Sequence, residues 1–591
     1  MKLNLEFCKE EEILEPEEKE LNAKIEKNLG NYEIAKEKDT SIELMLSLST
    51  IRENIINWYP LEKSAEILEI GANYGEITGY LCNLCENVTS VELSKEKAKI
   101  IAKRHSSKEN LECIVGNLED IQINKKFDYV TIIGQLEKAS KWLPNSSNPE
   151  KDLLLLSSKM LKENGKILFA TDNKFGIQYW NGKKDLEGTL EYKNLIEERT
   201  KNGSKLFGEK QLKEIIEETG YKNYKFYYVL PDYKMPNLIY SKDYTITKED
   251  ISRNFQYYGL NELVNFNENE VYIQLLNENK EIFNFFANSF FVEIGNETMQ
   301  NNIKYITFSN YRKEKYRIMT IIKDEEVIKK ATNKNAQEHI NNILKSNLEF
   351  NKANVEMIEK EENGKIVSKY INAERFDIFL EKANEKSFIE NFEKYTNILY
   401  QDAIDFEQIK NNPELKETIK NYDTSKLDKM KFTENAYLDF IPKNCFLIND
   451  IFYVFDQEWV ERYMPIEYII YRAIQNSNLG EEKKKLLNKK YNITENENLF
   501  IKLEQEFKEK STDNIMLKEI FNRKTVNREE IVATMNHYYN LKNIAETQKM
   551  ELQEEIKQLK NEIDSIYGSK TWKIAETLRK IKNIGTKRGK K

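Results

Sequence analysis

Short apolar runs alternate with amphipathic segments along the first half of the chain. Residues 64–81 pass from an apolar run through a glycine turn directly into a helical pattern. Further apolar runs at 87–94, 111–116, 127–134 and 166–170 read as strands with helices between them. This repeated order predicts an α/β fold with a doubly wound sheet, whose ligand crevice lies at the carboxyl ends of its strands.

The glycine turn has a spacing typical of nucleotide-binding turns. Glu69, Gly71 and Gly75 follow the pattern E-x-G-x-x-x-G, with Asn73 between the two glycines. Glycines there let the backbone approach a ligand closely at the start of a helix. Glu92 ends the next predicted strand roughly 20 positions after Gly71, where a carboxylate accepts hydrogen bonds from ribose hydroxyls. A similar turn that binds nothing, or one that binds a nicotinamide cofactor, is the alternative.

The glycine spacing and the strand order together resemble the class I S-adenosylmethionine (SAM) methyltransferases. The resemblance implies a Rossmann-like methyltransferase domain over residues 46–245, with SAM held by the glycine turn and by the acid that follows it. It also implies that Asn117 and Leu118, after the third strand, lie near the adenine. Residues 134–136, Gln135 among them, would lie near the methionine part of SAM.

The stretch after the fifth predicted strand carries a more specific resemblance. Residues 171–182 read TDNKFGIQYWNG, which resembles the E-N-K-F-G-L-K-Y-W segment of methyltransferases in surface-glycan biosynthesis, with an aspartate in place of the usual glutamate. Residues 224–236 resemble the closing strand and exit loop of the same proteins. The resemblance implies a glycan or glycolipid acceptor. The catalytic candidates are Asp172, Asn173, Lys174 and, after the fourth strand, Glu137.

A second pattern begins after connecting helices at 246–284. Three strands are predicted between residues 304 and 331, and a helix follows from Asn335. This order resembles the small lobe of a protein kinase. The resemblance implies that Lys329 pairs with Glu338 on the helix and with the phosphates of ATP.

Three polar residues give the strongest signal in this second region. Asp439 and Asn444 lie five residues apart, and Asp456 follows twelve residues later after an apolar strand. The spacing resembles the catalytic loop of kinases, which implies Asp439 as the base and Asn444 and Asp456 as ligands of Mg²⁺. The turn at 310–315 has no glycine to cover the phosphates, so the alternative is an inactive kinase-like domain, over 285–505, that serves as a scaffold.

The end of the chain predicts a stalk and a basic tail. The helical segment 506–568 carries an apolar heptad seam formed by Leu552, Ile556, Leu559, Ile563 and Ile566. The seam predicts a coiled coil and therefore a homo-oligomer; a surface helix packed on its own protein is the alternative. Residues 569–591 form a basic amphipathic tail that resembles the tails of cell-surface glycan enzymes. We expect it to contact an anionic membrane surface, against the alternative of solubilising charge.

Composition limits the partners and the compartment. The chain has 91 Lys and Arg against 99 Asp and Glu, a net charge of −8, so no global basic field indicates nucleic acid. The acidic segment 1–45 contains no signal peptide, and no apolar run approaches the ~20 residues that span a bilayer. Five scattered cysteines do not form a disulfide framework. We expect a cytoplasmic protein that can meet the inner face of the membrane through its tail.

The order of the predicted domains resembles bifunctional methyltransferase-kinase proteins that terminate O-antigen chains. The resemblance implies an enzyme that uses SAM, ATP and Mg²⁺ to phosphorylate and methylate the end of a cell-surface polysaccharide or its precursor. The alternative is an assembly protein with an inactive kinase-like domain. It would recruit glycosyltransferases, and methyl transfer would be its only chemistry.

Overall fold

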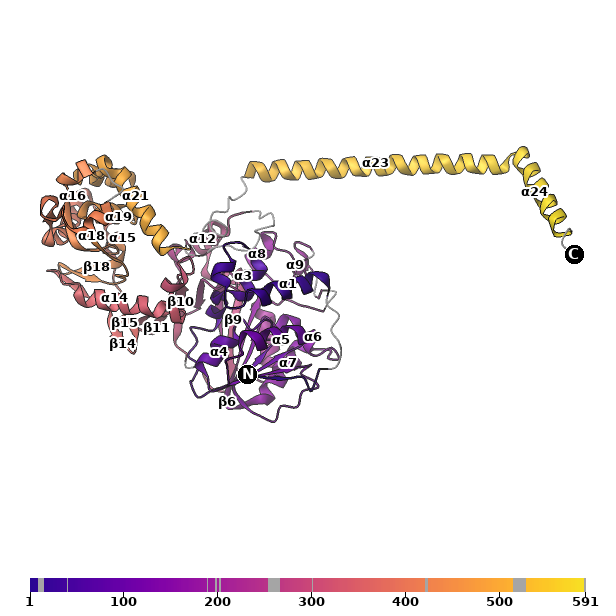
Figure 1. The fold of residues 1–591 in the computed structure, drawn as a ribbon, viewed down its shortest axis with the longest axis horizontal. Coiled ribbons are helices and arrows are strands. Elements are labelled where there is room, and N and C mark those ends of the chain that lie inside the picture. Colours follow the sequence, from indigo (N-terminus) through magenta and orange to yellow (C-terminus); the bar gives the residue numbers. More distant parts are fainter. Residues whose placement is uncertain are drawn as a thin grey trace. The chain divides into compact units, whose positions relative to one another are not determined.

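A computed structural model gives the fold of the chain in two units, Met1–Arg523 and Lys524–Lys591 (Figure 1). Each unit is described by itself. The structure describes residues 1–8, 15–39, 41–188, 190–196, 199–200, 203–252, 254, 266–299, 301–419, 424–513 and 528–588.

The first unit is built on a sheet of 14 strands, and its first half is a doubly wound parallel sheet. From the central strand β2, the chain adds β3 and then β4 on one side, crosses over, and adds β5 and β6 on the other. The order of the strands therefore reverses between β2 and β5, and a ligand crevice is expected at their carboxyl ends. The bounds are β2 Glu66–Ile70, β3 Asn87–Glu92, β4 Leu111–Val115, β5 Phe127–Ile133 and β6 Leu161–Asp172.

Helices cover both faces of this sheet, which explains why its strands are continuous apolar runs. On one face, Ile67 and Leu168 pack with residues of α4 and α5. On the other face, Leu68 and Phe169 pack with residues of α7 and α10. The bounds are α4 Thr78–Leu84, α5 Lys95–Arg104, α7 Pro149–Met160 and α10 Glu209–Glu218.

The sheet of the methyltransferase-like half extends beyond the predicted limits of 46 and 245. At one edge β1 (Lys2–Asn4) pairs in parallel with β4, so the predicted N-terminal segment contributes a strand. In its middle β9 (Ser289–Gly295) lies antiparallel between β6 and β7 (Asn223–Leu230). The predicted kinase-like domain therefore cannot begin at 285. The place of β9 between β6 and β7 could not be predicted from the sequence because three helices separate β9 from β8 (Leu238–Ser241) in the chain. These helices are α11 (Lys248–Ser252), α12 (Glu268–Glu278) and α13 (Lys280–Phe285).

N-terminal helices pack against the glycine turn that follows β2 and against α5, which follows β3. Ile25, Leu44 and Leu48 form a small apolar cluster with Tyr74 and Ile100. A 3₁₀ helix, Thr50–Ile55, follows α3 and leads towards β2. The bounds are α1 Pro16–Lys27, α2 Tyr32–Ala35 and α3 Ile42–Leu48.

The second half of the long sheet continues without a break from β8 into the order β10-β11-β12-β15-β14. Ile340 and Ile343 of α14 pack on this part with Ile318 and Ile366. Three strands followed by a helix are present where the sequence predicts them. The bounds are β10 Ile303–Phe308, β11 Ile318–Lys323, β12 Glu326–Ala331, α14 Gln337–Glu349, β14 Lys360–Glu362 and β15 Lys365–Lys369.

A mainly helical body with its own apolar core follows, drawn in orange in Figure 1. Two small sheets, β13-β19-β18 and β16-β17-β20, lie within it. Phe500 and Leu503 of α21 belong to the core of this body and Phe507 packs against it, so the predicted boundary between residues 505 and 506 falls inside one helix. The bounds are β13 Val355–Met357, α15 Phe376–Lys382, α16 Glu385–Leu399, β16 Ile404–Asp405, α17 Phe406–Ile409, α18 Pro413–Ile419, β17 Lys431–Tyr437, β18 Cys445–Ile448, β19 Ile451–Val454, β20 Val460–Pro465, α19 Ile466–Gln475, α20 Glu481–Lys490 and α21 Ile493–Ser511.

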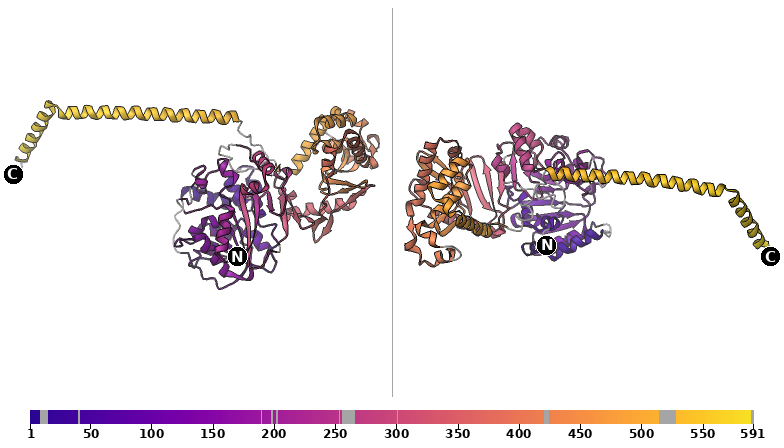
Figure 2. Two further views of the ribbon diagram at one scale, coloured as in Figure 1. Left: turned by 180° about the vertical axis from the view of Figure 1, so that it is seen from behind. Right: turned by 90° about the horizontal axis from the view of Figure 1, so that it is seen from above.

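The described residues of the second unit, 528–588, form the helices α23 (Arg528–Gly568) and α24 (Lys570–Arg588), seen in both views of Figure 2. The five apolar residues of the heptad seam on α23 are between 48% and 58% exposed. Such a row of exposed apolar side chains is what a coiled-coil seam requires, and the coiled coil stays a prediction.

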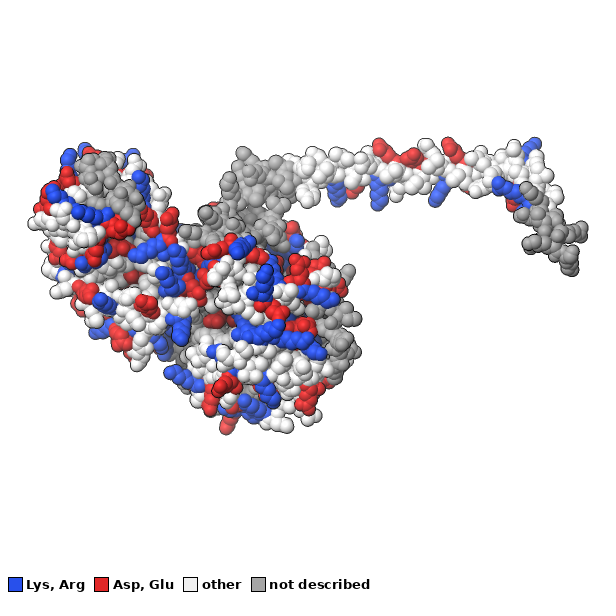
Figure 3. Space-filling model, viewed as in Figure 1, with Lys and Arg blue, Asp and Glu red and all other residues white. Residues whose placement is uncertain are grey.

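Charge is mixed over the surface of the first unit. Figure 3 shows Lys and Arg interspersed with Asp and Glu over the visible face. Among the described helices, none has the length and the apolar character needed to cross a bilayer.

Candidate active site

The glycine turn between β2 and α4 has the backbone that its sequence requires. Gly71 and Gly75 have φ of 79° and 77°, and Asn73 between them has φ of 51°. These angles lie in the left-handed region that favours glycine and tolerates asparagine. A Cβ on Gly71 would lie 2.3 Å from Cδ of Gln135, which follows β5. Because Gly71 has no side chain, its backbone lies directly against Gln135 at the end of β5.

Glu92 lies at the end of β3, within reach of the glycine turn. Its carboxylate accepts hydrogen bonds from the backbone amides of Asn73 (2.7 Å), Leu93 (3.0 Å) and Ser94 (3.1 Å). Burial raises the pKa of this carboxyl above its ordinary value. One amide of the turn and two amides that follow β3 thus hold the carboxylate next to the position that a ribose would take.

Glu69 is buried at the end of β2 and braces the helix that follows. Its Oε2 accepts hydrogen bonds from Thr78 Oγ1 (2.7 Å) and Ser90 Oγ (2.6 Å). Burial raises the pKa of Glu69 to about 7. The residue therefore fixes α4 relative to β2 and β3.

A cavity of about 270 Å³ lies at the glycine turn. The N-terminal segment forms one wall, through Leu21, Glu43, Leu46 and Arg52. Of the residues predicted to hold SAM, the cavity brings together Glu69, Gly71, Asn73 and Gln135. The remaining lining residues are Ser47, Ile70, Ala72, Glu76, Ile77, Ile133, Gly134, Lys138, Tyr233 and Lys234.

Four of the predicted SAM residues are not among those that line the cavity. Gly75 lies in the turn, and Glu92 is held by it. Leu118 is 3% exposed and belongs to the apolar core beneath the sheet edge. The amide of Asn117, oriented to donate, lies 3.1 Å from the carbonyls of Lys141 and Trp142. Its side chain thus holds the loop that follows β4 against the helix after β5.

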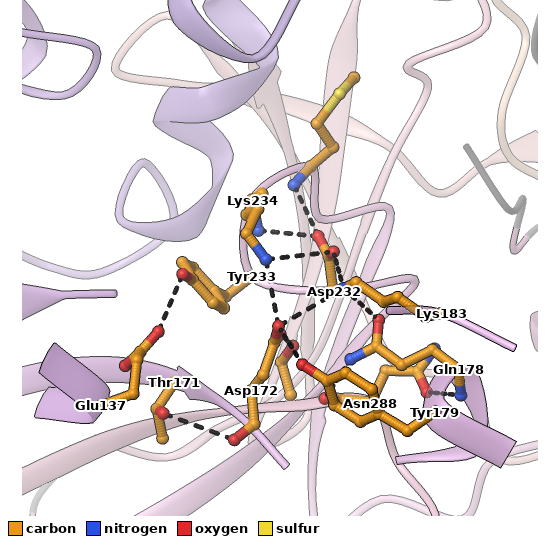
Figure 4. A network of polar contacts seen from close by, with 12 residues as sticks. Glu137, Thr171, Asp172, Gln178, Tyr179, Lys183, Asp232, Tyr233, Lys234 and Asn288 are labelled. Carbon is orange, nitrogen blue, oxygen red and sulfur yellow. Dashed lines mark hydrogen bonds and ion pairs between the residues drawn. The ribbon is translucent and has the colours of Figure 1, made fainter. Parts of the chain in front are cut away.

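Asp172 ends β6 and lies at the centre of a buried polar network (Figure 4). The residue is 0% exposed and accepts hydrogen bonds from Ser289 Oγ (2.6 Å) and Tyr179 OH (3.1 Å). Although burial alone would raise its pKa, Lys183 and Lys234 hold the pKa of this carboxyl below its ordinary value. An acid kept ionised with all its neighbours donating is a poor proton acceptor. In the structure Asp172, a catalytic candidate by sequence, therefore positions Lys234.

The two residues after Asp172 also differ from their predicted catalytic roles. Asn173 Nδ2 donates to the carbonyls of Phe285 (2.8 Å) and Ala287 (2.7 Å). It ties the end of β6 to the chain that enters β9. The ammonium of Lys174 lies 6.0 Å from the ring centroid of Phe175, and Lys174 is not among the residues that line the cavity.

The loop between β7 and β8 supplies two residues that the sequence analysis did not single out. Tyr233 and Lys234 reach the cavity from this loop. A Cβ on Gly134 would lie 2.5 Å from the hydroxyl of Tyr233, so the phenol lies directly against the end of β5. The sequence of residues 224–236 resembles a closing strand and exit loop, but nothing in its spacing shows which of its side chains face the cavity.

Glu137 and Tyr233 form a buried acid–phenol pair at this end of the cavity. Tyr233 OH donates to Glu137 Oε1 at 3.0 Å (Figure 4). Glu137 is 0% exposed, and its Oε2 has no hydrogen-bond partner among the described residues. Burial raises the pKa of this carboxyl above its ordinary value. Of the two acids named as candidates for methyl transfer, Glu137 rather than Asp172 has the environment of a proton acceptor.

Three cations line the same cavity. Arg52 Nη1 donates to the carbonyl of Lys234 at 2.7 Å, and its buried Nε has no hydrogen-bond partner within the described part of the chain. Burial lowers the pKa of Lys138. Lys234 is 26% exposed and pairs with Asp172 at 3.1 Å. Glu43, Glu69 and Glu76 line the cavity as well, so the three cations lie among carboxylates beside the glycine turn.

A comparison with protein-family profiles identifies this part of the chain. The profile described as a methyltransferase domain matches residues 68–169, which contain the glycine turn, Glu92 and strands β3 to β5. This part of the chain is a methyltransferase domain. It holds four of the predicted SAM residues, Glu69, Gly71, Asn73 and Gln135, at the crevice where a doubly wound sheet binds ligands.

Solved structures of methyltransferases give only distant likenesses. The CcbJ methyltransferase from Streptomyces caelestis is 18% identical over 21% of this chain and 50% of its own, with a TM-score of 0.19. Phosphoethanolamine N-methyltransferase 2 of Haemonchus contortus is 15% identical over 42% of this chain and 53% of its own, with a TM-score of 0.27. A SAM-dependent methyltransferase from Clostridium acetobutylicum is 22% identical over 23% of this chain and 55% of its own, with a TM-score of 0.20.

This chain thus spans about half the length of each of these three proteins. Likenesses at this level carry no argument about acceptor or mechanism. A search of curated proteins gives no significant match.

A second cleft, of about 550 Å³, contains the residues predicted for phosphoryl transfer. Asp439, Asn444 and Asp456 all line it, together with Arg312, Glu458 and Arg472. Burial raises the pKa of Asp439 to about 7, against the opposing effect of Arg472, whose Nη2 lies 3.5 Å from Oδ1. Asn444 Nδ2 donates to the carbonyl of Asp439 at 3.0 Å.

Lys329 contacts Asp456 of this cleft, but its second partner is not the predicted one. Its Nζ lies 2.5 Å from Oδ1 of Asp456 and 2.5 Å from Oε1 of Glu359, in the connection between β13 and β14. Glu338 is exposed in the first turn of α14, because that helix turns His339 and Ile340 inward. The predicted pair Lys329–Glu338 is therefore wrong, and Glu359 takes that place.

Within the described ranges, no group of three or more His, Cys, Asp or Glu side chains is arranged to hold a metal ion. The Mg²⁺ ligands inferred from sequence, Asn444 and Asp456, stay a prediction. Asp456 is held by Lys329, although burial and the neighbouring Glu458 raise the pKa of its carboxyl.

Proposed function

We propose that the methyltransferase domain transfers a methyl group from SAM to an anionic group on a cell-surface polysaccharide or its lipid-linked precursor. The observation that carries the anionic acceptor is the set of three cations, Arg52, Lys138 and Lys234, that line one cavity beside the glycine turn. Glu43, Glu69 and Glu76 line the same cavity and Lys234 is paired with Asp172, so the donor that supports an anionic acceptor best is the buried Nε of Arg52, which has no hydrogen-bond partner among the described residues. The resemblance of residues 171–182 to glycan methyltransferases supports the class of acceptor.

The chemistry favours a nucleophile that is already ionised. The acceptor oxygen attacks the methyl carbon as the C–S bond of the sulfonium breaks, so the site must align the two groups and keep water away. A phosphate or carboxylate oxygen needs orientation by cations rather than a base. A sugar hydroxyl, the second candidate, needs a proton acceptor, and the Glu137–Tyr233 pair favours it.

Mass spectrometry of the surface glycan, with and without this protein, tests the proposal. A missing methyl or phosphomethyl group is the expected result. Lys234→Gln should raise the KM for the acceptor and leave the affinity for SAM unchanged. Lys234→Arg should keep the KM for the acceptor near that of the unaltered chain. Lys210→Gln is the matched control because Lys210 is 91% exposed on α10. An unchanged glycan in the absence of the protein would exclude this acceptor class.

We also infer a phosphoryl-transfer activity for the second cleft, with ATP and Mg²⁺ as cofactors. Support comes from Asp439, Asn444 and Asp456 in one cleft with Lys329 beside Asp456. In this scheme the cleft phosphorylates a terminal sugar hydroxyl, with Asp439 taking its proton, and the methyltransferase domain then methylates the phosphate.

A single variant separates this scheme from its alternative. Asp439→Asn should leave SAM binding intact and remove both phosphate and methyl from the product. If the methyl group persists at full level, the second body is better explained as a scaffold that recruits glycosyltransferases.

The helices of the second unit suggest how the enzyme is placed in the cell. The seam on α23 would pair with a second copy to give a homo-oligomer, and α24 would hold the protein at the cytoplasmic face of an anionic membrane. Each basic residue near such a surface adds about 1 kcal/mol. Flotation with anionic liposomes is the test: a chain ending at Gly568 should float less than the full chain.

A further inference from the structure

The loop between β10 and β11 brings a guanidinium group to the second cleft at the place where kinases carry glycines. Arg312 in this loop forms a short ion pair with Glu458. Its guanidinium carbon lies 5.7 Å from the ring centroid of Tyr311 and 5.9 Å from that of Trp459. With 13% of its side chain exposed, Arg312 lines the same cleft as Asp439 and Glu458.

The backbone around Arg312 is fixed from two sides. Arg317 Nε donates to the carbonyl of Arg312 at 2.9 Å. The chain after α21 pairs with the loop, because Lys313 N donates to Ser511 O (3.1 Å) and Asp513 N donates to Tyr311 O (2.9 Å). The loop thus has a defined conformation without glycine, and the position of the guanidinium is set in advance.

Arg312 balances the negative charge of Glu458. Its side chain is only 4% exposed, and its carboxylate forms the ion pair with Arg312. His339 Nε2 lies 3.6 Å from the same carboxylate. Glu458 stands two positions after Asp456, in the segment predicted to hold the metal. Arg312 therefore neutralises an acid that a metal ion would otherwise neutralise.

We propose that Arg312 binds the phosphate chain of a nucleotide in the second cleft, leaving Glu458 as the nucleotide and its metal ion arrive. The proposal rests on the phosphoryl-transfer function inferred above. A phosphate group offers a guanidinium more charge and a better bidentate geometry than one carboxylate does. The divalent ion that accompanies the phosphates would replace Arg312 as the counter-charge of Glu458. The guanidinium group of Arg312 would then donate hydrogen bonds to the phosphates, as backbone amides do in a glycine-rich loop.

Calorimetric titration of the full chain with MgATP, with tripolyphosphate and with adenosine tests this role. Arg312→Gln should lower the affinity for MgATP and for tripolyphosphate roughly ten- to hundredfold and leave the affinity for adenosine unchanged. Arg312→Lys should have an affinity for MgATP between those of the unaltered chain and of Arg312→Gln, because lysine keeps the charge and loses the bidentate geometry. Arg462→Gln is the matched control, since Arg462 is 43% exposed and pairs with Glu434 on the surface.

Glu458→Gln probes the exchange itself. This variant should release Arg312 from its ion pair, so it should bind metal-free ATP more tightly than the unaltered chain does. The increase in ATP affinity on addition of Mg²⁺ should be smaller in the variant than in the unaltered chain. If the unaltered chain binds MgATP and Arg312→Gln binds it equally well, Arg312 has no such role although the phosphoryl-transfer function stands. If adenosine binding falls as much as MgATP binding, Arg312 is structural and the inference is overturned. If the unaltered chain binds no nucleotide, the inferred function fails together with this inference.

Discussion

Replacing Gly71 by alanine tests the glycine turn, and the chain offers a matched control. Gly71 has φ of 79°, and Gly220, after α10, has φ of 94°. An L-residue in this region costs about 1–2 kcal/mol at either position. A Cβ at Gly220 would meet no atom within 4 Å. Gly220→Ala therefore measures the backbone cost alone, away from the cavity.

The difference between the two variants comes from what the new methyl group meets. At Gly71 it would lie 2.3 Å from Cδ of Gln135, so that side chain must move. Gln135 Oε1 would then lose the hydrogen bond from Trp142 Nε1, now 3.2 Å long. Crowding of this kind costs about 1–3 kcal/mol beyond the backbone cost. The methyl group would also occupy the cavity where we place SAM, so affinity should fall more than tenfold, about 1.4 kcal/mol.

The assay is calorimetric titration of SAM into the full chain, with thermal unfolding measured on the same samples. Gly220→Ala should bind SAM like the unaltered chain despite a lower unfolding midpoint. Gly71→Ala should lose both affinity and stability. If Gly71→Ala binds SAM with unchanged affinity, the turn does not contact the cofactor. If Gly220→Ala loses affinity equally, the loss reports general destabilisation.

Three further predictions follow from the contacts described above. Glu92→Ala should weaken SAM binding roughly ten- to hundredfold, because unpaired ribose hydroxyls cost about 1–3 kcal/mol; equal calorimetric affinity would contradict this. Phosphoryl transfer should rise with pH to a plateau above about 7, because Asp439 accepts a proton only when ionised and burial raises its pKa to about 7; a pH–rate profile flat from 5 to 9 would exclude it as the base. Asp513→Ala should cost about 3–5 kcal/mol and lower the midpoint of thermal unfolding, because the buried carboxylate pairs with Lys36 (2.5 Å) and Arg317 (3.2 Å); an unchanged midpoint would refute this estimate.

The features that could be predicted from sequence are those that local patterns determine. The turn at Gly71 and Gly75 joins an apolar strand to a helix over a few residues, and only glycine fits its φ angles easily. The strands β2 to β6 are buried on both faces, so each appears as an apolar run. Asp439, Asn444 and Asp456 could be found because their spacing is short and their residue types are specific.

The features that were missed depend on contacts between distant parts of the chain. Strand β9 reaches the middle of the sheet only after three helices, so its place could not be inferred from the neighbouring pattern. The role of Asp172 depends on Lys234 and Ser289, and the partner of Lys329 is Glu359 rather than Glu338. Sequence identifies such polar residues but not the neighbours that set their charge.

The most direct test of the central claim is a crystal structure of the full chain with S-adenosylhomocysteine. We predict the ligand in the cavity at the glycine turn, with its ribose hydroxyls on Glu92 and its sulfur directed towards Tyr233 and Lys234. Density for the ligand at any other place, or a ribose without contact to Glu92, would contradict the account.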